Sequence, residues 1–182
     1  MVDASVAVKC LVEEIYSRQA DDLLAAWDQD NTCIAGPHLL PVEVSNALYK
    51  RVRQYQIALD TAVQLEAEFL GNDIKLMQSA SLYLLAIRLA SALEQPATYD
   101  SHYLALAEFL DCDYWTANQQ FYNAASSNYP RIHWIGEIYS ENPVSTGGRR
   151  MFLMRFTERA YTNYTEQDVH DSLNEAVRLT FS

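Results

Sequence analysis

The run YDSHYLALAE occupies residues 99–108, and the run DYWTAN follows it at residues 113–118. The first run predicts a helix that is entered on an acid and carries one apolar face. The second predicts a short strand that stops at a polar side chain. In α/β sheets, sites form where the carboxyl end of a strand lies beside the start of a helix. We therefore expect Asp100 and Asn118 to face each other across one crevice.

Outward from this stretch, short apolar runs alternate with amphipathic patterns along the first 138 residues. The predicted strands are 31–35, 74–77, 114–117 and 132–135. The predicted helices are 6–15, 20–27, 41–52, 60–70, 79–93, 101–110 and 119–126. Strands separated by helices of this length predict an α/β fold with a parallel sheet covered on both faces.

The composition is acidic, with 24 Asp and Glu against 13 Lys and Arg and a formal net charge of −11. Such a surface opposes loose binding to nucleic acid, and it suits a metal site, a basic partner or plain solubility. The three cysteines have no paired spacing and apolar neighbours, which predicts buried, reduced thiols. The longest apolar stretch, 81–93, is too short for a bilayer. We therefore expect a cytoplasmic protein without a membrane segment.

The character of the chain changes after residue 138. Residues 140–148 read as a linker, four arginines follow between 149 and 159, and 165–179 reads as a terminal helix. The sequence thus predicts one domain at 1–138 and a C-terminal extension at 139–182.

Four polar residues from separate segments form the candidate site: Asp3, Glu43, Asp100 and Asn118. Each falls where a strand is predicted to end or where a helix faces that point. Taken alone, each has an ordinary alternative. Asp3, Asp100 and Asn118 are also good helix N-caps, and Glu43 is also a normal solvated helix residue. The order and spacing of the four favour a site.

The segments around these residues resemble the motifs of PIN-domain ribonucleases, in particular the VapC-type toxins of bacterial toxin–antitoxin modules. The matching runs are VDAS at 2–5, EVSNAL at 43–48, YDSHYLALAE at 99–108 and TAN at 116–118. The resemblance covers 1–138 and implies a PIN-like three-layer α/β/α fold with a short, mainly parallel sheet. Two departures stand out. The family normally has Asp where this chain has Asn118, and its first strand is longer than the two residues before Asp3. The first strand is therefore expected to be clipped, or translation starts upstream of Met1.

The resemblance also implies a metal-dependent endoribonuclease that hydrolyses RNA phosphodiester bonds. Two carboxylates about 4 Å apart repel by roughly 4 kcal/mol at an effective dielectric near 20, so a cluster of acids calls for a cation. Oxygen ligands select Mg²⁺ or Mn²⁺. Asp3 and Asp100 are the main expected ligands, with Glu43 bound directly or through water. Asn118 offers an amide oxygen without charge, which weakens its part of the site.

Three further residues are expected to support the acids. Ser5 and Thr116 can hydrogen-bond and orient the carboxylates, although ordinary backbone capping explains them equally well. Asn46 lies one helical turn from Glu43 and shares its face.

For the substrate, Lys50, Arg51 and Arg53 follow Glu43 on the same helix and are candidate RNA-binding residues, or else a solvated helix face. Tyr49, Tyr55 and Tyr103 are candidate platforms for stacking unpaired bases, or else residues of the core or of a dimer contact. Of the four scattered histidines, only His102 lies near the candidate site.

The partners implied by the resemblance are an RNA substrate, a cognate antitoxin and a second copy of the chain in a homodimer. An antitoxin arginine placed among the acids would stand in for the cation. The alternative function is a degenerate PIN module that binds protein or RNA without cutting. The clipped first strand, Asn118 and the extension all favour that alternative.

Overall fold

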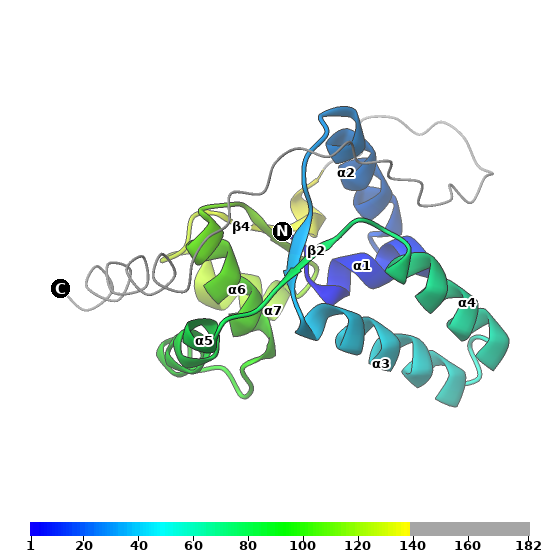
Figure 1. The fold of residues 1–182 in the computed structure, drawn as a ribbon. Helices are drawn as coiled ribbons and strands as arrows, with labels where there is room; N and C mark the ends of the chain where they lie inside the picture. The colour runs from blue at the N-terminus through cyan, green and yellow to red at the C-terminus, as the bar shows by residue number, and fades with distance from the viewer. Residues whose placement is uncertain (139–182) are drawn as a thin grey trace.

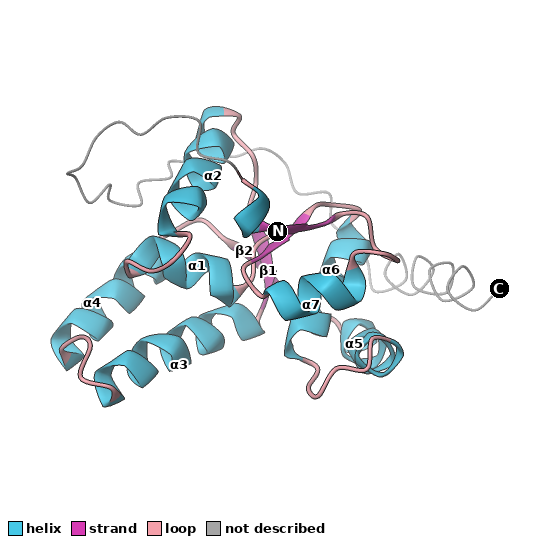
Figure 2. Cartoon of the chain, turned by 180° about the vertical axis from the view of Figure 1, so that it is seen from behind, coloured by secondary structure: helices cyan, strands magenta, loops and turns pink. Residues whose placement is uncertain are grey.

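The computed structural model describes residues 1–138 as a mixed α/β structure in which helices dominate and the strands are short and parallel. The helices are α1 Ala4–Leu11, α2 Ser17–Gln29, α3 Leu39–Arg53, α4 Leu59–Leu70, α5 Ala80–Ala92, α6 Tyr99–Leu110, α7 Gln119–Ala125 and the 3₁₀ turn Ile135–Glu137. The strands are β1 Ala35–Pro37, β2 Lys75–Met77, β3 Tyr114–Thr116 and β4 Ile132–Trp134. The strands lie between α1, α3 and α4 on one side and α5, α6 and α7 on the other (Figures 1 and 2). The predicted extension at 139–182 lies outside the described residues.

The strands form two parallel pairs rather than one sheet. β1 pairs with β2, and β3 pairs with β4. Val2 adds a single parallel bridge to Trp115. No bridge joins residues 1–3 to β1 in the described part of the chain. The predicted parallel direction is confirmed.

The predicted strand at 31–35 is displaced to Ala35–Pro37. The backbone N–H of Thr32 still donates to the carbonyl of Trp27, and Asn31 adopts a left-handed φ of 52°. Residues 30–32 therefore complete the end of α2, because Asn tolerates this conformation. Gly36 belongs to the strand, where an added Cβ would lie 2.7 Å from Leu40 Cδ2. A larger residue there would displace the buried Leu40 side chain, so the close approach of α3 to β1 favours a glycine.

The first predicted helix also ends early. α1 stops at Leu11, and Val12 is extended, so Ile15 lies in a loop and is 77% exposed. Its assignment to an apolar helix face was wrong. The cysteine prediction is partly wrong as well: within residues 1–138 none of the three forms a disulfide, but Cys33 is exposed and the other two are half-buried.

The core lies on both sides of the strands. α6 runs through its centre, and five consecutive residues from Tyr103 to Ala107 are buried. α3 contributes Leu40, Val44 and Leu48, which recur every fourth residue and form one apolar stripe. The packing of these helices in the core fixes the positions of α1, α3 and α6, near whose starts the candidate acids lie.

Across residues 1–138, none of the helices is long and apolar enough to cross a membrane.

Candidate functional site

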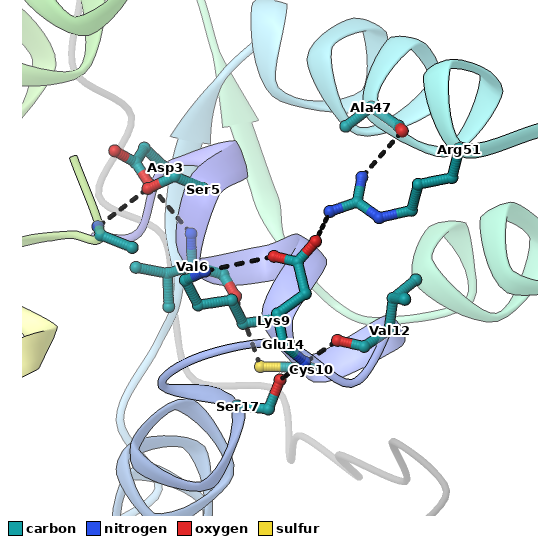
Figure 3. Close-up of polar contacts among 11 residues, drawn as sticks. Asp3, Ser5, Val6, Lys9, Cys10, Val12, Glu14, Ser17, Ala47 and Arg51 are labelled. Carbon is teal, nitrogen blue, oxygen red and sulfur yellow. Dashed lines mark hydrogen bonds and ion pairs between the residues drawn. The ribbon is translucent and has the colours of Figure 1, made fainter. Parts of the chain in front are cut away.

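Asp3 is the most buried of the candidate acids, at 1% exposure. It follows the Val2 bridge, and its side chain caps α1 by accepting from the backbone N–H of Val6 at 3.1 Å. Figure 3 shows this cap beside Ser5. The Ser5 hydroxyl donates to the same carboxylate oxygen, Oδ1, at 2.6 Å. The expected alternative role of Asp3 as an N-cap is therefore present in the structure.

The other oxygen of Asp3, Oδ2, faces β3. It accepts from Thr116 Oγ1 at 2.6 Å and from the Tyr114 hydroxyl at 3.1 Å. A carboxylate has about four acceptor positions, so protein donors occupy all of those on Asp3. Burial raises the pKa of Asp3, and the four hydrogen bonds act in the opposite direction.

Glu43 approaches the same region from the second turn of α3. Its Oε2 accepts from the Tyr103 hydroxyl at 2.6 Å, which ties α3 to α6. Burial raises the pKa of Glu43, the hydrogen bond from Tyr103 lowers it, and the nearby charge of Asp3 raises it. The other oxygen, Oε1, has no hydrogen-bond partner among the described residues and remains open to a ligand.

Asp100 and Asn118 meet as the sequence predicts. Asn118 Nδ2 donates to Asp100 Oδ2 at 3.0 Å. Asn118 Oδ1 accepts from the backbone N–H of Phe121 and caps α7. Asp100 itself is not a cap, because it is the second residue of α6 and Thr98 holds the N-cap position. The amide oxygen expected to bind a cation is therefore used in the helix cap.

Asp100 carries the strongest electrostatic signal of the site. Burial, together with the charges of Asp3 and Glu43, raises its pKa to about 7, against the hydrogen bond from Asn118. None of these three acids forms a salt bridge with a lysine or arginine in the described residues. Residues 1–138 thus gather three acids from separate segments without a direct ion pair, and the charge of Lys9 is close enough to interact with Asp3.

The oxygen atoms of these side chains are suitable ligands for a hard divalent cation, but they do not converge on one point. Among residues 1–138, no three His, Cys, Asp or Glu side chains are close enough to hold a metal ion as they stand. Glu43 and Asp100 each keep one open oxygen, whereas Asp3 would join only by losing a hydroxyl donor.

No protein-family model and no curated protein matches this chain. The function is therefore inferred from the chemistry of the site.

The predicted supporting residues divide into two groups. Ser5 and Thr116 both lie on Asp3, and each also holds the end of β3: Ser5 accepts from the N–H of Ala117, and Thr116 accepts from that of Asn118. Asn46 lies on an exposed part of α3 and makes no hydrogen bond to the acids within the described residues. Supporting contacts therefore come from α1 and β3 rather than from α3.

The predicted RNA-binding residues lie toward the far end of α3. The Arg51 guanidinium forms a salt bridge with Glu14 and donates to the carbonyl of Ala47 at 2.8 Å, as Figure 3 shows. Its side chain is only 13% exposed, so Arg51 does not lie on a solvated helix face, and its part in RNA binding stays a prediction. Lys50 and Arg53 are exposed. Ten residues of helix separate Glu43 from Arg53, a rise of about 15 Å.

Two tyrosines form a layer beneath the acids. Tyr103 and Tyr114 are buried and stacked, with ring centroids 6.0 Å apart and planes 15° apart. The expectation that Tyr103 is a platform for a base is therefore wrong. Sequence reasoning missed the contact between Tyr114 and Asp3. The available signal was the spacing of Tyr114 and Thr116, because residues two apart on a strand point to the same face.

Proposed function

We propose that residues 1–138 form a PIN-like domain and that the chain is a Mg²⁺- or Mn²⁺-dependent endoribonuclease, the toxin of a type II toxin–antitoxin module. The observation that carries the proposal is the gathering of Asp3, Glu43 and Asp100 without a salt bridge to a lysine or arginine in residues 1–138. Burial, together with the charges of Asp3 and Glu43, raises the pKa of Asp100 to about 7. Their arrival from three separate segments agrees with the resemblance of the flanking motifs.

Each residue has a distinct part in the proposed reaction. Glu43 and Asp100 would hold the ion through their open oxygens, and Asp3 would join them or act through its charge. When bound, the ion supplies a polarised phosphodiester and an activated water. Ser5 and Thr116 keep Asp3 in place, and Tyr103 orients Glu43. Asn118 positions Asp100 by donating to it and contributes no charge.

Under this proposal the partners are an RNA substrate, a cognate antitoxin and a second copy of the chain, all in the cytoplasm. The open acids suit a basic antitoxin side chain, because an arginine fork can pair with carboxylates in two places. Exposed apolar side chains on α5, including Leu84 and Ile87, suit contact with another copy.

A degenerate module that binds without cutting is the second candidate. Two contacts favour it: all acceptor positions of Asp3 are filled, and Asn118 presents an N–H group to Asp100 where the family has a further acid. Both contacts satisfy the acids without a cation and would weaken metal binding.

The proposal predicts that the full chain cleaves single-stranded RNA with Mg²⁺ or Mn²⁺, and that Asp100→Asn reduces cleavage to the level seen with EDTA. Removing this carboxylate takes away an open oxygen ligand. Asp60→Asn is the matched control, since Asp60 is the second residue of α4 as Asp100 is of α6. The control should cleave like the native chain. If Asp100→Asn cleaves as well as the native chain, the proposed site is rejected. If the native chain shows no metal-stimulated cleavage, the degenerate module is the remaining candidate.

Asn118→Asp is expected to bind Mn²⁺ about tenfold more tightly than the native chain, because ligand charge sets affinity for such ions. Without metal, the new carboxylate beside Asp100 should lower the melting temperature, and Mn²⁺ should restore it. Titration calorimetry and thermal unfolding measure the two effects. Asn123→Asp, on an exposed position of α7, is the control. Unchanged Mn²⁺ affinity in Asn118→Asp would show that position 118 does not belong to a metal site.

A further inference from the structure

A cavity of about 240 Å³ opens at the start of α6, the helix that carries Asp100. It lies where β1 and β2 end and where α5 and α6 begin. His38 follows β1, Ser79 caps α5, and Tyr99 and His102 come from the first turn of α6. Tyr99 directly precedes Asp100 in α6, so the cavity and the candidate site draw on the same turn of that helix.

The walls of the cavity are rich in rings. Tyr83 from α5 and Tyr99 from α6 line it and are 49% and 57% exposed, so each side chain is partly open to solvent. His102 meets Tyr83 edge to face, with ring centroids 5.0 Å apart. His38 adds a fourth ring. Aromatic side chains arranged in this way are the usual platforms on which proteins stack unpaired bases.

The charge of the cavity favours a neutral ligand. No lysine or arginine lines it. A phosphate group would find no permanent cation here. Gln78 offers an amide with one donor side and one acceptor side, which matches the polar edge of a nucleobase.

The size of the cavity limits the ligand further. Sites for drug-sized molecules are roughly 300–1,000 Å³, so a cavity of about 240 Å³ suits one planar base. We propose that this cavity holds a single unpaired nucleobase of an RNA strand whose backbone passes Asp100. The choice of RNA rests on the function proposed above, whereas the preference for a flat neutral ring rests on the lining alone.

The test is binding of a fluorescein-labelled single-stranded RNA hexamer to the full chain, measured by fluorescence anisotropy in EDTA so that no cleavage intervenes. Tyr83→Ala and Tyr99→Ala should each raise the Kd by about fivefold or more, as expected for loss of a stacking partner. A hexamer lacking its bases should bind the native chain more weakly by a similar factor. The two tyrosines are about half exposed, and unchanged melting temperatures will show that the variants fold.

Tyr55→Ala is the matched control, because Tyr55, the 96% exposed candidate platform just beyond the end of α3, does not line the cavity. It should bind like the native chain. The proposal is overturned if the hexamer does not bind, if binding ignores the bases, or if Tyr55→Ala weakens binding while the two cavity variants do not.

The cleavage assay separates this proposal from the nuclease. Base-dependent binding without any cleavage would support the base-binding cavity and reject the proposed nuclease activity. Cleavage without base-dependent binding would support the nuclease and reject the base-binding role of the cavity.

Discussion

Replacing Asp3 with alanine is expected to lower the free energy of unfolding by about 3 kcal/mol. The change removes the cap of α1, a loss of about 0.5–2 kcal/mol. It also leaves the hydroxyls of Tyr114 and Thr116 buried without their acceptor, at about 1–3 kcal/mol each. The relief of burying a charge, which raises the pKa of Asp3, offsets part of this sum. Urea unfolding at pH 7 in EDTA measures the difference.

Asp3→Asn is the variant to compare with Asp3→Ala. It keeps the volume and one acceptor oxygen for Ser5 and Val6, so it should lose clearly less stability than Asp3→Ala. A loss below about 1 kcal/mol in Asp3→Ala would mean that the four hydrogen bonds only balance the desolvation of the charge. In that case Asp3 would not be the structural centre of the site.

The stability of the metal-free chain is expected to fall as the pH rises toward neutrality, and Asp100→Asn should remove much of this dependence. The folded pKa of Asp100 is about 7, against 3.8 for the ordinary group. Between these values the folded chain keeps a proton that the unfolded chain has released, so stability decreases with rising pH. The full difference corresponds to about 4 kcal/mol. Since Asp100 is only partly buried, we expect Asp100→Asn to be more stable than the native chain by roughly 2 kcal/mol at pH 8.

Thermal unfolding between pH 5 and 8 in EDTA tests this expectation. Asp60→Asn should keep the native pH dependence, because Asp60 is exposed at the matching position of α4. Glu43 and Asp3 also have raised pKa values, so a smaller slope should remain in Asp100→Asn. A native chain whose stability rises with pH over this range would contradict the charge cluster.

Local patterns predicted most of the elements well. The helix at α6 and the strand at β3 follow from their apolar spacing, and Ser79 and Asn118 cap α5 and α7 because their side chains can accept from a free backbone N–H. The pairing of Asp100 with Asn118 followed from the rule that strand ends and helix starts meet. The errors lie where tertiary contact overrides local preference. The start of β1 was shifted by the turn at Asn31 and by the packing of Gly36 on Leu40.

What the sequence by itself determined is the alternation of helices and parallel strands and the positions of three acids along the chain. Only the tertiary structure decided how those acids are satisfied. The hydroxyls of Tyr114 and Tyr103 reach Asp3 and Glu43 across 111 and 60 residues of chain. The tertiary structure likewise decided that Arg51 forms a salt bridge with Glu14. The reason is physical: spacing along a chain fixes which face a side chain takes, whereas hydrogen-bond partners depend on which faces the packed core brings together.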